Sequence, residues 1–406
     1  MTPFETSEHI IRVLQSFGHQ AFLVGGSVRD LVLGREPKDF DVTTSATPEQ
    51  VQAIFEKTLA VGAAFGVVIV VINDIQVEVA TFRIDGEYSD VRRPDSVTFT
   101  RSAKEDVVRR DFTINGLLLC EALASPTELD ESLRTRVMGN LAVLDYVGGL
   151  ADLENKVIRA IGNPEERFTE DALRMLRAVR FAAQLGFEIE SATFAAICKL
   201  APTIRKVSRE RVTAELIKLV TAPFPVKGLV PLVTSGLLQE ILPDLYLKFD
   251  RTLRRFALNP TKDPIKGLAM FFVDATAGLY ESIKSLRLSY DESAAVVGAC
   301  GAVTTLQLNN TIAGQKKLAR RPGFFTGVDL FEQNGGDAKT VAFFRALTPE
   351  EINPKPFLTG DDLVARGLQP GPEFGRLLGA LEVEQLEGRV TTREEAEAFY
   401  ERLTVH

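Results

Sequence analysis

Two aspartates, Asp39 and Asp41, stand on either side of one phenylalanine in the stretch FLVGGSVRDLVLGREPKDFDVTT. Residues two apart on a β-strand point to the same face, so a strand here would present both carboxylates to one spot. Carboxylates this close repel each other, and oxygen ligands of this kind hold Mg²⁺. The spacing indicates a metal site, in which two ions roughly 3.5–4 Å apart grip the attacking and leaving oxygens of a phosphoryl transfer. The bare pattern also fits a surface strand with two solvated acids.

The glycine pair upstream favours the metal site over the solvated strand. The run LVGG ends an apolar strand at Gly25 and Gly26, and SVRDLVLG begins a helix. The first N–H groups of a helix can receive phosphate oxygens. We therefore expect nucleotide phosphates to bind at this turn, through Gly25, Gly26, Ser27, Arg29 and Asp30.

A third acid lies in the alternating run IQVEVATFR, which follows a turn predicted at Asn73 and Asp74. Glu78 is the one acid of that run and is the candidate for a third catalytic carboxylate. A solvent-facing acid on an edge strand explains it equally well.

The motif RRDF brings together Arg109, Arg110 and Asp111. Two guanidiniums beside a carboxylate suit the clamping of phosphates and the binding of a ribose hydroxyl. Taken alone, such a cluster is also typical of a surface salt bridge.

A polar stripe follows in a helix predicted to begin at Thr169, where Asp171, Arg174, Arg177 and Arg180 recur every three residues. A charged exterior helix face is the alternative. An Asp–Arg pair places an acceptor beside a donor, whereas cytosine and adenine place an exocyclic amine beside a ring-nitrogen acceptor. The stripe therefore predicts a site that accepts C and A and refuses U and G.

Composition limits the class of protein. The chain has 406 residues, 45% of them hydrophobic and 25% charged, which indicates a globular protein of two to four domains. The densest apolar run, VGAAFGVVIVVI from Val61 to Ile72, is too short for a bilayer and suits a buried strand. The start, MTPFETSEHI, has no signal-peptide pattern, so we expect a cytoplasmic protein without membrane contact.

Other counts exclude further classes of site. Three distant cysteines cannot build a disulfide framework, and three histidines cannot assemble a histidine–aspartate hydrolase site. The net charge of −8 leaves room only for local basic surfaces. Two clusters supply such surfaces, RTLRRF from Arg251 to Phe256 and GQKKLARR from Gly314 to Arg321. Each predicts a phosphate-contacting stripe, and a solvated helix face explains either one alone.

The pattern of elements changes along the chain. Short β-rich runs among helices fill the first 120 residues, and from about Asp145 the pattern is almost entirely helical. Between the two, residues 120–144 are interpreted as an excursion that leaves the sheet and returns through a turn at Gly148 and Gly149. The predicted fold class is therefore α+β.

These motifs resemble a known family. The glycine pair followed by Asp39-Phe40-Asp41-Val42 is similar to the nucleotidyltransferase superfamily that includes DNA polymerase β. The chain is more closely similar to class II tRNA nucleotidyltransferases (CCA-adding enzymes) and bacterial poly(A) polymerases. The motifs that carry this resemblance are RRDFTING (109–116), DYVGGLADL (145–153), EDALRMLRAVRFAAQLGF (170–187), SRERVTAEL (208–216) and, more weakly, LTGDDLVARGLQPGPEFGRLL (358–378).

The resemblance implies a polymerase-β-like catalytic head over residues 1–145, followed by a helical neck over 146–220, which selects the nucleotide. A body over 221–330 and a tail over 331–406 would bind tRNA. It implies Mg²⁺, CTP and ATP as ligands and addition or repair of the 3′-terminal CCA of tRNA, and we expect a monomer. Asp39, Asp41 and Glu78 would be catalytic, RRD would recognise the ribose, and the stripe from Asp171 to Arg180 would select the base.

Several alternatives stay open within this resemblance. Poly(A) polymerases carry a basic RRF-type stretch where this chain has GAAFGVVIV, residues 62–70, and its absence favours tRNA end synthesis. The polar segment from Asp85 to Phe99 predicts a mobile loop, which enzymes restricted to CC lack. An enzyme that adds only A and an inactive RNA-binding protein are the remaining alternatives.

Overall fold

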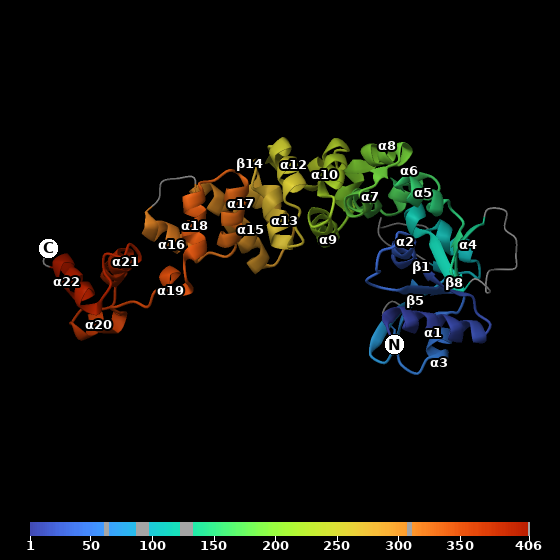
Figure 1. Ribbon diagram of the computed structural model, residues 1–406, viewed down its shortest axis with the longest axis horizontal. Coiled ribbons are helices and arrows are strands. Elements are labelled where there is room, and N and C mark those ends of the chain that lie inside the picture. The colour runs from blue at the N-terminus through green and yellow to red at the C-terminus, as the bar shows by residue number, and fades with distance from the viewer. Residues whose placement is uncertain (61–64, 87–96, 122–132, 307–310, 405–406) are drawn as a thin grey trace. The chain divides into compact units, whose positions relative to one another are not determined.

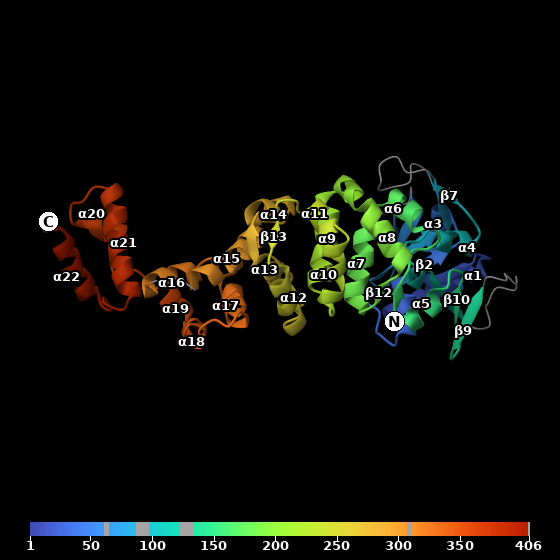
Figure 2. The same cartoon turned by 90° about the horizontal axis from the view of Figure 1, so that it is seen from above.

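The computed structural model describes residues 1–60, 65–86, 97–121, 133–306 and 311–404. The chain divides into two compact units, Met1–Pro243 and Asp244–His406 (Figure 1). The first unit contains the large sheet and the second is almost entirely helical (Figure 2). Among the described residues, no helix is both long and apolar enough to cross a membrane.

An eight-stranded mixed sheet forms the core of the first unit, in the order β3-β4-β5-β2-β1-β8-β10-β9. Its strands, in that order, are Thr58–Leu59, Val67–Ile72, Ile75–Thr81, Asp41–Thr44, Ala21–Val24, Leu117–Glu121, Leu141–Asp145 and Arg134–Met138. Strand β2 lies in the middle, antiparallel to β1 and parallel to β5. This central place fixes the position of the residues at the start of β2.

The predicted turn and the predicted buried strand are both present. Asn73 and Asp74 have φ angles of 48° and 63°, as a tight hairpin requires, and they join β4 to β5. In β4, Val68 and Val70 are fully buried. Residues 61–64 of the expected apolar run lie outside the described part of the chain.

The interpretation of residues 120–144 as an excursion from the sheet is wrong for the described part of that segment. Strand β9 pairs with β10, and β10 pairs with β8, so both strands extend the sheet at one edge. The consecutive apolar residues of LAVLD, with Ala142, Val143 and Leu144 all buried, suit β10 to a place inside the sheet beside β8. Residues 122–132 lie outside the described residues.

Helices cover the sheet and continue from it to the end of the first unit. They are α1 (Pro3–Ser16), α2 (Gly26–Val32), α3 (Pro48–Ile54), α4 (Ala103–Val108), the 3₁₀ turn Thr113–Asn115, α5 (Gly149–Asn155), α6 (Pro164–Glu170), α7 (Leu173–Leu185), α8 (Ser191–Leu200), the 3₁₀ turn Ala201–Lys206, α9 (Arg209–Val220), α10 (Pro225–Thr234) and α11 (Leu237–Ile241). The described residues also form three short pairs of strands. In the first unit these are β6 (Arg83–Asp85) with β7 (Val97–Phe99) and β11 (Val157–Ile158) with β12 (Glu188–Ile189), and in the second unit β13 (Tyr246–Leu247) pairs with β14 (Ala275–Ala277). Helix α7 packs against both α9 and α10.

The prediction of one continuous helix from Thr169 is wrong. Helix α6 ends at Glu170 and α7 begins at Leu173, because Asp171 has an extended backbone with φ −139° and ψ 103°. The Asp171 Oδ1 atom accepts a hydrogen bond from the N–H of Leu173 at 3.0 Å. An aspartate that bonds forward to the backbone in this way competes with helix and starts a new one.

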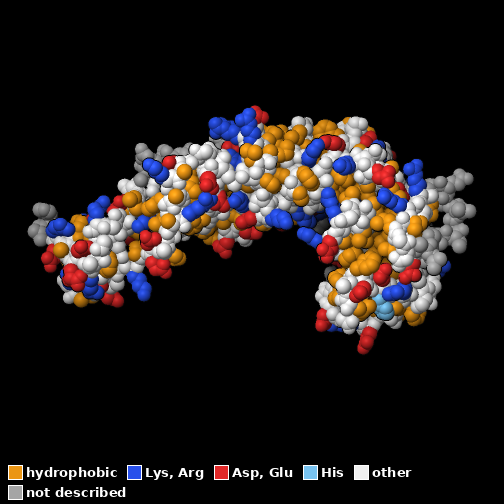
Figure 3. All heavy atoms as spheres, in the orientation of Figure 1, with side chains coloured by type: hydrophobic (Ala, Val, Ile, Leu, Met, Phe, Trp, Pro, Cys, Tyr) orange, Lys and Arg blue, Asp and Glu red, His pale blue; other side chains and the backbone are white. Residues whose placement is uncertain are grey.

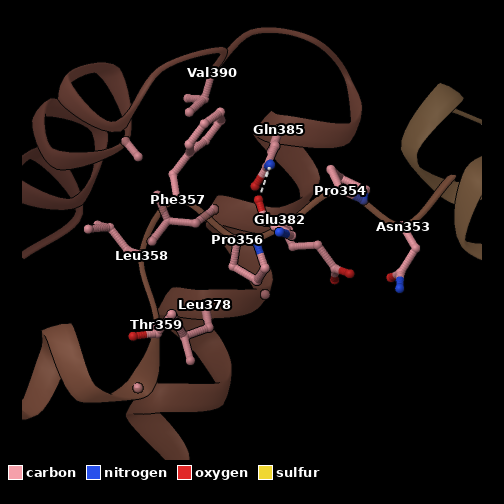
Figure 4. Close-up of a pocket in the computed structure, with 15 residues that line it drawn as sticks. Asn353, Pro354, Pro356, Phe357, Leu358, Thr359, Leu378, Glu382, Gln385 and Val390 are labelled. Atoms are coloured by element: carbon pink, nitrogen blue, oxygen red, sulfur yellow. Dashed lines mark hydrogen bonds between the residues drawn. The ribbon is translucent and has the colours of Figure 1, made fainter. Parts of the chain in front are cut away.

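The second unit consists of α12 (Phe249–Leu258), α13 (Pro264–Phe272), α14 (Leu279–Ser285), α15 (Tyr290–Leu306), α16 (Ile312–Ala319), α17 (Phe324–Gln333), α18 (Ala338–Ala346), α19 (Pro349–Ile352), α20 (Gly360–Ala365), α21 (Pro372–Leu386) and α22 (Arg393–Thr404). Near its end, the segment from Asn353 to Gly360 runs beside α21 and bounds a cavity of about 510 Å³ (Figure 4). The Gln385 side chain anchors this segment by donating to the Lys355 carbonyl at 2.7 Å. The expected division into head, neck, body and tail stays a prediction.

Candidate active site

A cavity of about 680 Å³ in the first unit brings most of the predicted site residues together. The residues that we expected and that line it are Gly25, Gly26, Arg29, Asp39, Asp41, Arg109, Arg110, Asp111, Asp171, Arg174, Arg177 and Arg180. Ser27 and Asp30 line an adjoining cavity of about 410 Å³, which shares Gly26, Arg29, Asp39 and Asp41 with the first. Glu78 lines neither cavity.

The two aspartates share the cavity, although they do not share a strand. Strand β2 begins at Asp41, so the prediction of one strand that holds both residues is wrong. The register that pairs Val42 with Val79 places Glu78 beside Asp41 on the neighbouring strand. Glu78 is exposed, but β5 lies between β4 and β2, so the edge-strand alternative for this acid is also wrong.

The acids are poorly compensated by positive charge. Asp41 reaches solvent in the open cavity, yet the surrounding protein withdraws it from bulk water. This desolvation, with the charges of Glu78 and Asp39 added, raises the pKa of Asp41 to about 6, and Arg110 opposes the shift only in part. Negative charge gathered in this way favours a bound cation.

The donor set fits a divalent ion that is shared with a substrate. Among the described residues, no group of three or more His, Cys, Asp or Glu side chains is placed to hold a metal ion. Mg²⁺ is usually bound by one or two carboxylates together with substrate phosphates, so it does not need such a cage. Asp39 and Asp41 supply two carboxylates at one cavity wall, and this matches that mode of binding.

The glycine turn lies next to these acids. Gly25 has φ 78° and ψ −131°, a conformation that side chains disfavour, and a Cβ atom there would stand 3.8 Å from Arg110 Nη1. Ser27 is buried and its hydroxyl donates to the Val24 carbonyl at 3.1 Å. Arg29 is held by Asp30 at 2.8 Å and by Asn115 Oδ1 at 2.8 Å. The guanidinium is therefore fixed at the cavity wall before any ligand arrives.

Asp106 is a residue that sequence reasoning missed. It is fully buried, and Arg109 and Arg110 each donate to it at 2.9 Å. The Thr43 hydroxyl, two residues after Asp41, lies 3.3 Å from the same carboxylate. Burial opposes ionisation, but Arg110 and Arg109 outweigh it and hold the pKa of Asp106 below its ordinary value. The spacing of three and four residues on a helix is the signal that predicts such pairs.

Asp111 has a different partner from the one that the RRDF motif indicates. Its Oδ2 atom accepts from Arg177 on α7 at 2.8 Å, and its Oδ1 atom accepts from Asn115 at 3.2 Å. Burial alone would raise its pKa, but the Arg177 and Asn115 contacts lower the pKa of Asp111 to about 2. The two arginines of the motif thus bind Asp106 on α4, whereas its aspartate binds Arg177 on α7.

Each arginine of the α7 stripe is paired with an acid. Arg174 binds Glu170 at 2.6 Å, and Arg180 binds Glu215 on α9 at 2.5 Å. Their side chains are 11% and 8% exposed, so the alternative of a solvated exterior face is wrong. Burial lowers the pKa of Arg180 to about 10, although Glu215 opposes that shift. The Arg180 guanidinium also lies 3.8 Å from the centre of the Phe181 ring.

Asp171 and Arg174 do not bind each other through their side chains. Asp171 Oδ2 accepts from Arg211 on α9 at 2.7 Å. Arg174 donates to Glu170 and to the carbonyls of Arg167 and Arg109. The contributions of α9, Arg211 and Glu215, were missed, and their separation of four residues in SRERVTAEL was the available signal.

The two basic clusters differ in the structure. On α12, Arg251 and Arg254 are exposed, whereas Arg255 is buried against Asp274. On α16, Lys317 and Arg320 both pair with Glu382 of α21. Glu382 therefore already engages Lys317 and Arg320, and the expectation that this cluster contacts phosphates stays a prediction. The expected loop from Asp85 to Phe99 stays a prediction, since residues 87–96 lie outside the described residues and only its flanking strands are seen.

Comparisons with known proteins agree with this geometry. A family model described as Poly A polymerase head domain matches residues 21–159, and one described as probable RNA and SrmB-binding site of polymerase A matches residues 186–248. The CCA-adding enzyme of Levilactobacillus brevis is 33% identical over 407 residues, covering 97% of this chain and 96% of its own. That of Streptococcus suis is 35% identical over 405 residues, covering 97% and 95%.

Two solved structures are also similar to this chain. The Bacillus stearothermophilus CCA-adding enzyme, in complex with CTP, has a TM-score of 0.76 at 28% identity and covers 100% of this chain and 98% of its own. The Thermotoga maritima enzyme, complexed with tRNA_CCA, has a TM-score of 0.68 at 19% identity, covers 99% and 96%, and shows the fold alone. The nucleotidyltransferase fold generally uses divalent metal ions. Since relatives of this identity span nearly the whole chain, it belongs to the CCA-adding enzymes, a family of tRNA nucleotidyltransferases.

Proposed function

We propose that this chain adds or repairs the 3′-terminal CCA of tRNA, taking CTP and ATP in turn without a nucleic-acid template. The observation that carries the proposal is the cavity of about 680 Å³, in which poorly compensated carboxylates face arginines that are already held by acids. The wall that carries Asp39 and Asp41 suits the phosphates of a nucleoside triphosphate, and the wall that carries Asp171 and Arg174 suits its base.

The phosphate end belongs at the wall of Asp39 and Asp41. These two carboxylates would hold two Mg²⁺ ions. Bound Mg²⁺ would lower the pKa of the attacking hydroxyl and neutralise charge on the departing pyrophosphate. Arg29 and Arg110 flank the glycine turn and are placed to bind triphosphate oxygens. Glu78 is proposed as an outer acid that adds negative charge beside Asp41.

The reaction is an in-line displacement at the α-phosphorus. The 3′ oxygen of the RNA forms a bond to that phosphorus, the bond to the bridging oxygen breaks, and pyrophosphate leaves. The residues of this chain act mainly by position, because phosphoryl transfer needs alignment and charge stabilisation more than covalent help. The ribose is assigned to Asp111 with Arg109 and Arg110, at the junction of the two walls.

The base end belongs at the wall of Asp171 and Arg174. Each Asp171 oxygen accepts one protein hydrogen bond, so each retains a lone pair for an exocyclic amine. Arg174 has five N–H donors and uses three of them on Glu170 and two carbonyls. Arg177 and Arg180 support this pair from the next two turns of α7. An acceptor beside a donor selects C and A.

Two further expectations belong to this proposal. A cytoplasmic location follows from the tRNA substrate. The division into a catalytic head over 1–145, a neck over 146–220, and a body and tail over 221–330 and 331–406 for tRNA is the organisation that we propose.

Product sequencing tests the function. Three tRNAs that end before CCA, after C and after CC are incubated with CTP, ATP or both. The proposal predicts that all three are completed to CCA when both CTP and ATP are present. Extension of only the CC-ended tRNA would indicate an enzyme that adds A alone. Long A tails from ATP would indicate a poly(A) polymerase, and no extension would indicate an inactive RNA-binding protein.

A further inference from the structure

Phe40, the residue between the two cavity aspartates, contacts α1, a helix none of whose described residues lines either cavity of the active site. Its ring centre lies 5.5 Å from that of Phe4, and the two ring planes are inclined at 59°. Phe4 belongs to the first turn of α1, and both rings are half-buried. Aromatic pairs at this separation and tilt attract each other beyond the effect of apolar burial.

The sheet separates α1 from the active-site cavity. A small cavity beneath α1 is lined by Leu23, so this face of β1 is turned toward the helix. Leu23 is paired with Val42 of β2, and directly opposed residues of an antiparallel pair share a face. Asp41 and Thr43 therefore point to the other face, where the Thr43 hydroxyl lies 3.3 Å from Asp106 of α4. Lys and Arg side chains gather over α9, which lines the active-site cavity (Figure 3).

The segment that carries Asp39 and Phe40 is not held by the sheet. Strand β2 begins at Asp41, so both residues precede its paired part. Within the described part of the chain, residues 36–40 make no hydrogen bond and no ion pair. Phe40 contacts α1 while Asp39 and Asp41 line the cavity, as alternation along an extended chain requires. A ring held from the α1 side therefore limits how far the two carboxylates can turn.

The first turn of α1 is well anchored. Thr2 and Glu5 form a capping box, in which the Glu5 carboxylate accepts from the Thr2 N–H at 2.7 Å and the Thr2 hydroxyl accepts from the Glu5 N–H at 3.2 Å. Thr6 and Ser7 are buried, and their hydroxyls donate to main-chain carbonyls one turn earlier, each at 2.9 Å. The helix packs against β1, β2 and β5. A ring carried by this turn therefore has a fixed position.

We propose that Phe4 is a positioning residue for the two carboxylates, because its contact with Phe40 fixes the orientation in which Asp39 and Asp41 face the cavity. This role rests on the proposed function, since it concerns the acids assigned to Mg²⁺. Residues that orient metal ligands raise the affinity for the ion, because the ligands need not be ordered when it binds. The contact should supply a factor of about two to ten in Mg²⁺-dependent binding, the range expected for an aromatic pair.

The test measures CTP binding to the full-length chain without tRNA, so that no nucleotide is added. Each protein is titrated in EDTA and in Mg²⁺, and the ratio of the two affinities is its Mg²⁺-dependent gain. Phe4→Ala removes the ring, and Phe4→Tyr retains it. Phe17→Ala is the matched control, because it makes the same change at the other end of α1, where the side chain is 63% exposed. Circular dichroism verifies that every variant folds.

Phe4→Ala should keep the parent's affinity for CTP in EDTA, and its Mg²⁺-dependent gain should be about two- to tenfold smaller. Phe40→Ala should lose the same factor. The double variant should lose no more than either single variant, because the two rings act through one contact. Phe4→Tyr and Phe17→Ala should match the parent.

The positioning role is overturned if Phe4→Ala has the same Mg²⁺-dependent gain as Phe17→Ala. It is also overturned if Phe4→Ala loses as much affinity in EDTA as in Mg²⁺, which marks general damage to the fold, or if the losses from Phe4→Ala and Phe40→Ala add in the double variant. Extension of tRNA by the parent is measured in parallel. A parent that shows the gain but extends no tRNA contradicts the proposed function alone, and a parent without the gain overturns the positioning role as well.

Discussion

The two walls of the active-site cavity treat charge in opposite ways. On the wall formed by the start of β2, Asp41 lies beside Glu78, and desolvation together with the charges of Glu78 and Asp39 raises the pKa of Asp41 to about 6. On the wall formed by α7, the arginines are matched with acids, as Arg177 is with Asp111 at 2.6 Å and Arg180 with Glu215 at 2.5 Å. The β2 wall therefore carries net negative charge, whereas the charges on the α7 wall almost cancel.

This difference separates what each wall can do. An uncompensated pair of carboxylates stores repulsion that a cation relieves, so it suits metal-dependent chemistry. Arginines that are fixed by acids lose little freedom when a ligand binds, so they suit the reading of hydrogen-bond patterns. The comparison assigns chemistry to β2 and base choice to α7.

Removal of a carboxylate from the β2 wall should have the largest effect. Asp39→Asn or Asp41→Asn should reduce the rate of nucleotide addition by at least about 10³-fold, because the charge that holds the metal is lost. The fold and the affinity for tRNA should change little, since neither acid has a neutralising partner to lose. Single-turnover rates at saturating Mg²⁺ measure the effect. The control is Asp74→Asn, an identical chemical change at an exposed turn, and near-parent rates in the Asp39 or Asp41 variants would refute the assignment.

Removal of an acid that pairs with an arginine of α7 should lower the free energy of unfolding. Glu215→Gln leaves Arg180 buried without its partner, and breaking a buried ion pair typically costs about 3–5 kcal/mol. Urea unfolding measures the loss. Glu210→Gln, an exposed change on the same helix, should shift the free energy of unfolding by less than about 0.5 kcal/mol. Equal effects of the two variants would show that the α7 wall is not built on this pair.

The Asp111–Arg177 pair should appear in the pH dependence of stability. Asp111 has a folded-state pKa of about 2, below its ordinary value of 3.8. A lowered carboxyl pKa contributes stability that is complete above about pH 4 and is lost as the pH falls toward 2. The contribution is on the order of 2 kcal/mol. Unfolding of the parent and of Asp111→Asn from pH 7 to pH 2 should give curves that converge in acid. Parallel curves would contradict the lowered pKa.

Much of the fold was predictable because it rests on local patterns. The β4–β5 turn follows from Asn73 and Asp74, and the helical second half follows from apolar spacing. The apolar spacing of the predicted helix shows neither the helix break at Asp171, which has a local cause, nor the distant partner of that residue. Asp171 starts a new helix by bonding to Leu173, and its partner Arg211 lies 40 residues further along the chain.

The candidate site shows the same division. The glycine turn, the aspartates and the arginines were found, because their chemistry is carried by residue type and spacing. Asp106 was missed although its spacing from Arg109 and Arg110 was a local signal, whereas Glu215 was missed because it meets Arg180 from a distant helix. Glu78 could be placed beside Asp41 only once the register of β2 and β5 was known.

Substitutions of Asp171 and Arg174, the residues proposed to select the base, should have the smallest effect of these predictions, and it should appear as a change in nucleotide selectivity. Asp171→Ala removes the acceptor for the exocyclic amine, so UTP and GTP should gain on CTP and ATP by about 1–3 kcal/mol. Arg174→Ala should lose more rate, because it removes the donor to the base and leaves Glu170 with Arg167 as its remaining partner at 2.6 Å. The measurement is kcat/KM for all four nucleotides on suitable acceptor tRNAs. An unchanged ranking at near-parent rates in both variants would place base choice elsewhere.

The division of labour between the two walls is tested most directly by nucleotide binding to a chain that cannot react. Asp41→Asn, bound to tRNA that ends before CCA, is titrated with each of the four nucleoside triphosphates, with and without the additional change Asp171→Ala. The account predicts that Asp41→Asn adds no nucleotide yet still binds CTP more tightly than UTP or GTP, and that Asp171→Ala removes this preference. If Asp41→Asn alone abolishes the preference, or if the double variant retains it, the two walls do not divide chemistry from base choice.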